Sequence, residues 1–492
     1  MAVALTGPGG PAAATGAATF SNFSLAGIAP NGGGAVGTSC PGSPKCTNIA
    51  AEPAIRADEQ GNIYASSENG LGAGTEAWKS TDGGRHYVTL PSPNAGSQSN
   101  TTGFAPGGGD TDLAVGDDPG KSGAVSVFVA SLSLANVDVS SSTDRGNSFA
   151  LNPVGALIPG DDREWIAADD SHQNPLGLPT EGGNKVCLSY HDVATDNIDV
   201  NCSYDGAKTF TQLGDAIDTS HAYLIDNNAI GNLAIGRDVY EGDGTHGNHN
   251  IYQVFSGIGN AQEAIGTSEH FHVVWIGVSK DGGQTFTDYP VYRGPKTTDY
   301  GHQFVNVSVD RKGNLYVVYS DDHNLYYSYS TTQGTSWSPP IRVNKAPANT
   351  AIEPWSVAGS NGKLDVVYYG TSYYQAGTAP DNYPATAQWH AYLAQNLTAT
   401  TPGSSFTQVA ASPVNHTGGV CESGVGCTGN RDLFDDFGVA VTPSTGLASI
   451  VYSDDQYHAG NPNTPGCTPA TTDTSSCNHT AIATQLTGAG VS

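Results

Sequence analysis

The stretch SKDGGQTF at residues 279–286 has four counterparts along the chain, and together they decide the fold. The others are STDGGRHY (80–87), STDRGNSF (142–149), SYDGAKTF (203–210) and STTQGTSW (330–337). Each begins with Ser and ends with an aromatic residue, and all carry Asp at the third position except the last, which has Thr332. Such a segment predicts a tight β-turn, in which the Asp carboxylate accepts backbone N–H groups and a Gly adopts a positive φ. Five of these turns between strand-like runs indicate a repeating all-β architecture.

A second repeat begins upstream of each turn, where polar or charged residues open a strand that leads through a Gly/Asn/Asp turn into a β-branched and aromatic strand. The seven openings are EPAIRAD (52–58), GDTDLAV (109–115), DREWIAAD (162–169), NNAIGNLAI (227–235), GHQFVNVSVD (301–310), EPWSVAG (353–359) and DDFGVAV (435–441). Seven units predict a seven-bladed β-propeller of four-stranded antiparallel blades, with six blades as the alternative. The last unit lacks one strand, which we expect the segment ATFSNFSLAG (18–27) to supply. We therefore expect a single domain over residues 18–492, preceded by a flexible segment at residues 1–17.

The turn segments resemble the Asp-boxes, or BNR repeats, of the sialidase-like β-propeller superfamily. The resemblance implies that each box joins the outer two strands of a blade, far from any active site, and that its Asp is structural. The superfamily includes hydrolases, lyases, receptors and sugar binders, so the motif specifies fold better than activity.

Sialidases of this superfamily bind the sugar carboxylate with three arginines, and use a Tyr activated by a Glu as nucleophile and an Asp as acid/base. Among the nine arginines of this chain, the resemblance makes Arg163, Arg237 and Arg431 candidates for substrate binding. Tyr369 is a candidate nucleophile, with strand packing as the alternative. The Arg-Ile-Pro motif of the family is absent, and EPAIR stands in the first blade instead, which argues against sialic acid as the substrate.

Composition narrows the possible partners. The 492 residues include 46 acidic and 19 basic ones, for a net charge of −27. Such a surface repels a phosphate backbone, so nucleic acid is not an expected partner. No run of about 18 apolar residues is present, so no membrane span is expected. We expect a monomer that acts on an extracellular glycan or polysaccharide.

The cysteines and the N-terminus point to a secreted protein. Eight cysteines form four close pairs along the chain: Cys40 with Cys46, Cys187 with Cys202, Cys421 with Cys427, and Cys467 with Cys477. Their spacing matches neither a zinc site nor a redox motif, so four local disulfides and an oxidising compartment are predicted. The first twenty residues lack the basic start and apolar core of a signal peptide, and we interpret them as the start of a mature chain.

In a propeller the first strand of every blade lines the channel, so the seven openings should meet at one mouth. The predicted catalytic residues there are Asp162, Glu164, Glu353, Asp436 and His302. The predicted substrate-binding residues are Arg163, Arg237, Arg431, Trp165, Trp355, Tyr300 and Tyr369. Carboxylates this close together need raised pKa values, a cationic partner or a bound cation, so Asp110, Asp112 and Asp435 are predicted ligands of Ca²⁺.

Three functions remain open on the sequence. The first is a glycoside hydrolase that uses two mouth carboxylates as acid and as base or nucleophile, with aromatic rings stacked on the sugar. The second is a polysaccharide lyase, in which His302 or a Tyr abstracts a proton beside a carboxylate neutralised by Arg163 or a cation. The third is a non-catalytic propeller that binds glycan, peptide or calcium.

Overall fold

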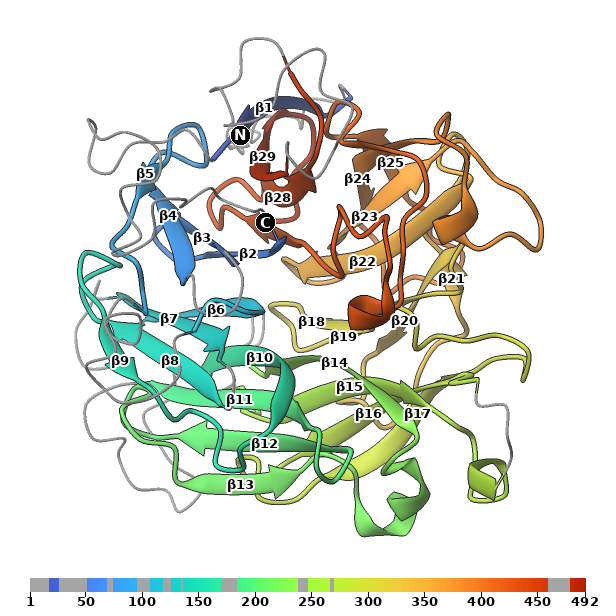
Figure 1. Cartoon of the computed structure of the whole chain (residues 1–492). Helices are drawn as coiled ribbons and strands as arrows, with labels where there is room; N and C mark the ends of the chain where they lie inside the picture. The colour runs from blue at the N-terminus through green and yellow to red at the C-terminus, as the bar shows by residue number, and fades with distance from the viewer. Residues whose placement is uncertain are drawn as a thin grey trace, which may run out of the picture.

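The computed structural model describes residues 17–25, 51–68, 74–94, 107–117, 125–133, 136–169, 184–237, 247–265, 270–458 and 478–492. These residues form seven antiparallel sheets arranged around a central channel (Figure 1). The seven-bladed prediction is therefore confirmed, and the six-bladed alternative is wrong. The described helices are short 3-10 turns at Thr219–Leu224 (η1), Glu263–Ile265 (η2), Pro380–Asn382 (η3) and Gly424–Gly426 (η4).

The blades follow one another along the chain, and in each of the first six the first strand lies innermost. The first three blades are β2 (Ala51–Ala57), β3 (Ile63–Glu68), β4 (Thr75–Ser80) and β5 (Val88–Thr89); β6 (Thr111–Asp117), β7 (Val125–Leu132), β8 (Val137–Ser142) and β9 (Ala150–Asn152); and β10 (Asp161–Asp169), β11 (Lys185–Asp192), β12 (Asn197–Ser203) and β13 (Gln212–Asp215).

The next three blades repeat this order. They are β14 (Asn228–Ile235), β15 (Ile251–Gly257), β16 (Val273–Ser279) and β17 (Thr287–Arg293); β18 (Asn306–Val309), β19 (Leu315–Ser320), β20 (Leu325–Ser330) and β21 (Ile341–Arg342); and β22 (Thr350–Ala358), β23 (Leu364–Thr371), β24 (Gln388–Asn396) and β25 (Thr407–Ala410), with β26 (His416–Thr417) also paired to β24.

The seventh blade combines both ends of the chain. Its strands are β27 (Gly438–Val441), β28 (Ala448–Asp454), β29 (His479–Thr487) and, outermost, β1 (Thr19–Ser24). Thr19 pairs with Thr487 and Ser24 with Ala481, so the N-terminal strand closes the ring as predicted (Figure 1). The predicted segment 1–17 lies outside the described residues, apart from Ala17.

All five turn segments lie between the third and fourth strands of a blade, and their hydrogen bonds match the expected turn chemistry. In the fourth blade, Asp281 Oδ1 accepts N–H groups from Gln284 (3.0 Å) and Thr285 (3.0 Å). Gly283 adopts φ +95°, whereas Ala207 stands at the equivalent place in the third blade with φ +64°. Thr332 Oγ1 replaces the missing carboxylate and accepts the N–H of Ser336 at 3.0 Å.

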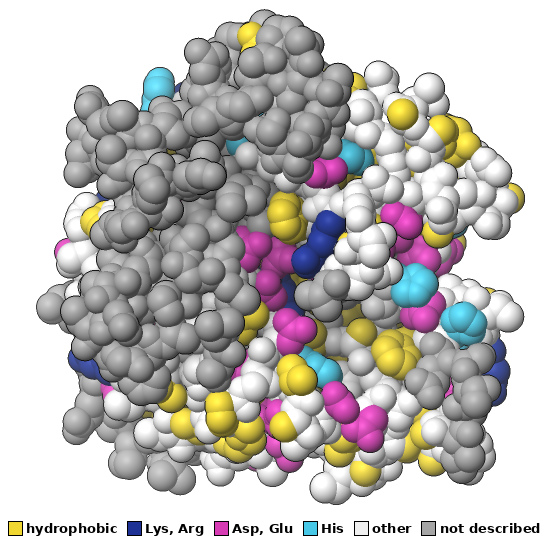
Figure 2. All heavy atoms as spheres, viewed as in Figure 1, with side chains coloured by type: hydrophobic (Ala, Val, Ile, Leu, Met, Phe, Trp, Pro, Cys, Tyr) yellow, Lys and Arg dark blue, Asp and Glu magenta, His cyan; other side chains and the backbone are white. Residues whose placement is uncertain are grey.

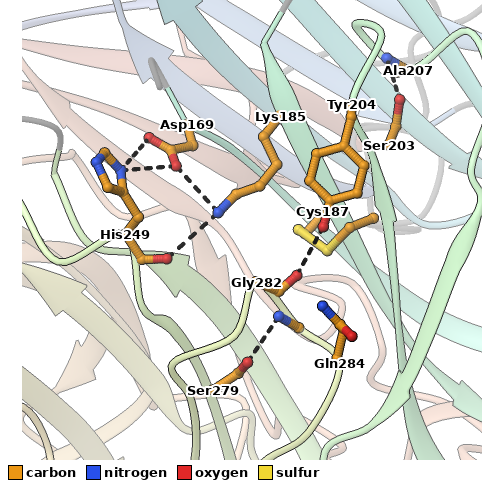
Figure 3. Close-up of a disulfide and its surroundings, with 12 residues drawn as sticks. Asp169, Lys185, Cys187, Ser203, Tyr204, Ala207, His249, Ser279, Gly282 and Gln284 are labelled. Atoms are coloured by element: carbon orange, nitrogen blue, oxygen red, sulfur yellow. Dashed lines mark hydrogen bonds and ion pairs between the residues drawn. A yellow bond between two sulfur atoms is a disulfide. The ribbon is translucent and has the colours of Figure 1, made fainter. Parts of the chain in front are cut away.

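Two of the four predicted disulfides lie within the described residues, and both have formed. Cys187 and Cys202 face each other on β11 and β12, fully buried, and Cys421 is joined to Cys427. Figure 3 shows the first bridge beside Tyr204, whose hydroxyl donates to the carbonyl of Gly282 in the next blade (3.2 Å). It therefore lies where blades three and four meet. Cys40, Cys46, Cys467 and Cys477 fall outside the described residues.

In the part of the chain that the structure describes, no helix has the length and apolar character needed to span a bilayer.

Candidate functional site

Three inner strands begin with the same irregularity at one mouth of the channel. The pairing register shifts near the start of β2, β10 and β22, and the residues at these bulges are Glu52 (φ +46°), Arg163 (φ +40°) and Glu353 (φ +50°). A left-handed backbone costs a residue with a side chain about 1 kcal/mol or more. Bulges re-aim side chains and concentrate beside functional sites, and each of these carries a charged group to the mouth.

Arg163 connects three blades at this mouth. Its Nη1 lies 2.9 Å from Glu52 Oε2 of the first blade, and its Nη2 lies 2.5 Å from Asp436 Oδ2 of the seventh. The guanidinium stacks 3.7 Å above the ring of Trp165, and the side chain is 5% exposed. Although burial lowers the pKa of Arg163, the charges of Asp436 and Glu52 outweigh it and raise the pKa. Arg163 is thus a buried cation held between two carboxylates.

The carboxyl groups around Arg163 are more numerous than the cations that neutralise them. Burial raises the pKa of Glu52 well above its usual value, and the nearby Asp110 raises it further. Burial and Asp110 act in the same direction on Glu164, whose two carboxyl oxygens are buried without a hydrogen-bond partner. Burial therefore favours the protonated form of both side chains.

Two cavities open at this mouth, where acidic side chains gather around a basic one near the centre of the ring (Figure 2). The larger, which we call the mouth cavity, has a volume of about 560 Å³. The smaller, which we call the Glu353 pocket, has a volume of about 370 Å³. Phe304, Asp435 and the disulfide-closed loop 421–427 contribute to the walls of both. The mouth cavity is lined by Glu68, Gly109, Asp110, Leu132, Asp162, Arg163, His191, Asn228, Ala229, Ile230, Phe304, Ser423, Gly424, Arg431 and Asp435.

The Glu353 pocket places an acid opposite an ion-paired carboxylate. Glu353 is 4% exposed, and its Oε2 is buried without a partner. Burial raises its pKa well above the usual value, and the charge of Asp435 is the next largest cause. Asp435 itself is bound by Arg431 at 2.5 Å. The two carboxyl groups thus line one pocket in different surroundings, one buried without a partner for its Oε2 and the other paired with an arginine.

Gln303 and His302 complete this pocket. The side-chain oxygen of Gln303 accepts the N–H of Glu353 (2.8 Å), while its amide nitrogen donates to Glu422. His302 Nδ1 lies 2.9 Å from Asp322, and this hydrogen bond raises the pKa of His302 to about 9. His302 is therefore a cation at neutral pH, and not the free base that proton abstraction would need.

The aromatic residues predicted to stack on sugars lie beneath the site. Trp165 is 1% exposed, and its ring packs 5.0 Å from that of Trp355, also buried. Tyr300 is buried against Tyr319 in a cluster of tyrosines. The burial of these three rings argues against the stacking role: a bulge lies beside each tryptophan, and Tyr300 packs inside its tyrosine cluster from the loop between β17 and β18. Phe304, partly buried, is the aromatic ring that reaches both cavities.

Two further predicted residues lie away from the mouth surface. Tyr369 is fully buried, stacks on Phe437, and its hydroxyl accepts the N–H of Ser453 (2.9 Å), so it packs the interior. Arg237 follows the end of β14, lines a cavity of about 230 Å³ at the opposite mouth, and bonds Glu59 there (3.2 Å). An eight-residue strand spans about 26 Å, so the residue after its end cannot share the mouth with its start.

The predicted calcium ligands are not gathered at one point. Asp112 binds Arg56 (2.9 Å) and accepts the N–H of Ile166 (3.0 Å), whereas Asp110 and Asp435 line the mouth cavity. Among the described residues, three ligand atoms lie within 4.8 Å of one another at two other places, Asp218–His221–Asp288 and His416–Asp432–Asp455. Calcium at the mouth stays a prediction.

Of the residues predicted for the site, the structure brings Asp110, Asp162, Arg163, Arg431 and Asp435 to the mouth cavity, and His302, Glu353 and again Asp435 to the Glu353 pocket. Glu164 and Asp436 lie directly behind them around Arg163. The sequence assigned no role to Glu68, Glu422 or Phe304. The close cysteine pair around Glu422 was the available signal for that residue, because a small disulfide loop fixes its side chains in place.

Comparisons with known proteins give no family and only distant structural similarities. No family model and no curated protein matches the sequence. Among solved structures, a protein of unknown function from Dyadobacter fermentans shares 12% identity at a TM-score of 0.45, over 95% of this chain and 98% of that one. The GH74 xyloglucanase from Xanthomonas campestris shares 13% sequence identity at a TM-score of 0.46. The match covers 88% of this chain and 53% of the xyloglucanase, so this chain spans about half the length of that enzyme. The GH93 α-L-arabinofuranosidase of Fusarium graminearum shares 15% sequence identity at a TM-score of 0.42, and the match covers 71% of this chain and 93% of the arabinofuranosidase.

Proposed function

We propose that this protein is a secreted glycoside hydrolase that cleaves an extracellular glycan in the Glu353 pocket. One observation carries the proposal: a buried Glu353, whose pKa burial raises well above its usual value, and an Arg431-bound Asp435 line the same pocket. Glycoside hydrolysis requires one carboxyl group that is protonated and acts as the acid, and a second that is ionised and acts as base or nucleophile.

In this proposal Glu353 donates its proton to the glycosidic oxygen as the bond to the leaving sugar breaks. Asp435, which Arg431 binds, stabilises the positive charge that develops on the sugar ring or activates the attacking water. Gln303 fixes the backbone of Glu353, while Phe304 offers an apolar face to the sugar.

Two features weigh against the lyase alternative. His302 is held as a cation between Asp299 and Asp322, so it has no free basic nitrogen to abstract a proton. Arg163 is already paired with Glu52 and Asp436 and its side chain is 5% exposed, so a uronate carboxylate would have to compete with these two acids for it.

The test compares wild type with Glu353→Gln and Asp435→Asn on a panel of purified glycans and aryl glycosides. We expect Glu353→Gln to lower kcat by about 100-fold or more on natural glycans, as loss of a general acid does. The loss should shrink on dinitrophenyl glycosides, because that leaving group departs without protonation. Asp435→Asn should slow both classes alike.

Glu59→Gln, at the opposite mouth, is the matched control and should leave the rate unchanged. If wild type cleaves a glycan and Glu353→Gln retains its rate within about tenfold, the acid is misassigned. If wild type binds glycans but cleaves none, the protein is a binding propeller and the hydrolase proposal is wrong.

A further inference from the structure

The Glu353 pocket and the mouth cavity adjoin each other at the channel mouth. Both have Phe304, Asp435 and the loop residues Ser423 and Gly424 in their walls. Glu353 lines only the pocket, and the mouth cavity is the larger of the two, with a volume of about 560 Å³ against about 370 Å³. A glycan that occupies the pocket with one sugar unit can therefore place the next unit in the mouth cavity.

The two arginines in the walls of the mouth cavity are already paired with acids of the protein. Arg163 lies between Glu52 and Asp436. Arg431 binds Asp435 at 2.5 Å, and its Nη2 lies 3.5 Å from Glu52. The carboxylate of an anionic sugar would have to compete with these acids for either guanidinium.

The histidines in the walls do not change this balance. His191 lines the mouth cavity, and burial lowers its pKa, which favours the neutral ring. His302 lines the Glu353 pocket as a cation, but its Nδ1 lies 2.9 Å from Asp322. Outside the described residues, the sequence contains only two Lys or Arg residues, Lys45 and Lys121. The described walls of the two cavities therefore have no cation without an acidic partner.

The acids of the mouth cavity contribute little negative charge for a related reason. Burial, together with the nearby Asp110, raises the pKa of Glu68 to about 8. Burial is also the main cause of the raised pKa of Asp110, and Asp435 is paired with Arg431. Asp162 is exposed, so solvent screens its charge. A ligand that carries a charge of either sign thus finds no strong partner in this cavity.

The mouth cavity instead offers apolar surface beside uncharged polar groups. Leu132, Ile230 and Phe304 contribute apolar side chains, while Asn228 and His191 contribute an amide and an imidazole. A neutral sugar ring has matching parts, because it carries C–H groups on its faces and hydroxyls, which both donate and accept hydrogen bonds, around its edge. Binding sites for small molecules commonly combine apolar walls with a few polar groups in this way.

We propose that the mouth cavity binds an uncharged sugar unit, and that the substrate is a neutral glycan whose cleaved bond joins this unit to the one in the Glu353 pocket. The position of the cleaved bond rests on the proposed function, whereas the binding of a neutral sugar rests on the walls of the cavity. Glycans built from uronic acids or from amino sugars with a free amine are not substrates in this proposal.

Binding is measured separately from cleavage, by titration calorimetry of the Glu353→Gln variant. The ligands are the mono-, di- and trisaccharides of glucose, xylose, mannose and galactose, with trigalacturonate and triglucosamine as charged counterparts. We expect at least one neutral series to bind, with a gain in affinity of about tenfold or more from the first sugar unit to the second. Both charged trisaccharides should bind more weakly than the neutral one by about tenfold or more. Added salt should change the affinity for the neutral ligand less than about twofold, because the attraction is not between charges.

Two variants, each made in the Glu353→Gln background, locate the second unit. Ala229→Trp fills the mouth cavity and should remove the gain from the second unit while leaving the single sugar bound. Ala234→Trp is the matched control, since Ala234 lies on the same strand β14 but lines the cavity at the opposite mouth. Asp162→Lys supplies the unpaired cation that the walls lack, and should strengthen trigalacturonate binding by about tenfold or more. Because Asp162 is exposed, this variant tests the proposal even if the bulkier ones do not fold.

Four results would each overturn the proposal. They are the absence of binding by any neutral series, equal affinity for one and two units, tighter binding of either charged trisaccharide than of every neutral one, and an unchanged gain from the second unit in a folded Ala229→Trp variant. Trigalacturonate binding that does not respond to Asp162→Lys would show that charge does not decide what enters the cavity, and would overturn the preference for a neutral sugar.

The two proposals fail in different ways. If wild type cleaves a glycan in a Glu353-dependent manner but the second unit adds no affinity, the hydrolase stands and the second sugar site is wrong. If a neutral oligosaccharide binds with the expected gain and nothing is cleaved, the second sugar site stands and the hydrolase is wrong.

Discussion

The turn segments and the channel mouth both contain carboxyl groups, but the pKa of a turn aspartate is lowered whereas that of a mouth acid is raised. Asp281 in its turn accepts hydrogen bonds from Ser279 (2.8 Å), from two backbone N–H groups and from Thr285 (2.6 Å). Against the effect of partial burial, the bonds from Thr285 lower the pKa of Asp281. Glu164 at the mouth has no such donors, and burial raises its pKa well above the usual value.

The difference shows that the supply of donors, and not the residue type, decides what a carboxyl group does in this fold. The turn aspartates recur in blade after blade and are satisfied within their own turns, so they stabilise strand connections. The mouth carboxyls occur once each, come from different blades and are left partly unsatisfied. Unsatisfied, protonated acids are the kind that catalysis or ligand binding can use.

The largest effect on stability is expected from removing Arg163, the cation that pairs with both Glu52 and Asp436 at the mouth. Arg163→Ala leaves Asp436 buried without its cationic partner and Glu52 with only a longer contact to Arg431 (3.5 Å), so we expect the free energy of unfolding at neutral pH to fall by about 3–5 kcal/mol. The loss should shrink at mildly acidic pH, where both carboxyls are protonated and need no cation. Urea unfolding at both pH values measures it. Arg85→Ala, on an exposed turn, should have almost no effect, and an equal loss in both variants would contradict the contrast.

A smaller effect should follow from neutralising one mouth acid. A carboxyl whose pKa is raised on folding contributes stability that is complete below its unfolded value and is lost as the pH rises through its folded value. Glu164→Gln removes that loss, so the variant should exceed wild type in unfolding free energy by about 2 kcal/mol at alkaline pH. At about pH 4 the two should agree closely.

The whole protein should show the same trend. Asp365 and Asp288 have pKa values raised by burial to about 7 and about 8, so wild-type stability should decline between about pH 4 and about pH 8. Thermal unfolding across this range provides the measurement. A stability that rises over the range would show that the buried carboxyls are ionised.

The smallest effect on stability is expected in the turn segments, where the fifth blade has Thr332 in place of the Asp found in the other four. Thr332 already performs the role of Asp in the fifth blade through its hydroxyl. Asp281→Thr should therefore cost only about 1 kcal/mol, the net value of one or two exchanged hydrogen bonds, and should not alter glycan binding. The reverse change, Thr332→Asp, should stabilise by a similar or smaller amount. A loss of binding in Asp281→Thr would show that the turns contribute to the site.

The fold was largely predictable because its evidence is repeated. Five turns and seven strand openings specify blade number, strand order and, because the last unit lacks one strand, the closing role of residues 18–27. The alignment of the seven strand openings also indicated which residues lie near one mouth, as Asp162, Arg163 and Glu353 illustrate.

The failures arose where one residue had to be oriented. Trp165 and Trp355 lie in correctly predicted strands, but a bulge beside each decides which side chain faces the mouth, and no sequence signal marks a bulge. Arg237 could have been excluded by counting along its strand. Glu68 comes from the end of a second strand, which is brought to the mouth by the hairpin turn and carries no repeated mark.

The closing strand has a consequence for how the protein is made. Residues 19–24 are synthesised before every other described strand, yet their partner β29 is the last of these strands, because Thr19 contacts Thr487 across 468 residues. At about 5–20 residues per second, the first strand waits roughly 20–90 s for that partner. Until the two meet, β29 presents an open edge that the first strand of a second copy can fill equally well. High expression therefore favours chains linked by exchanged first strands, and dilution during refolding favours closed rings.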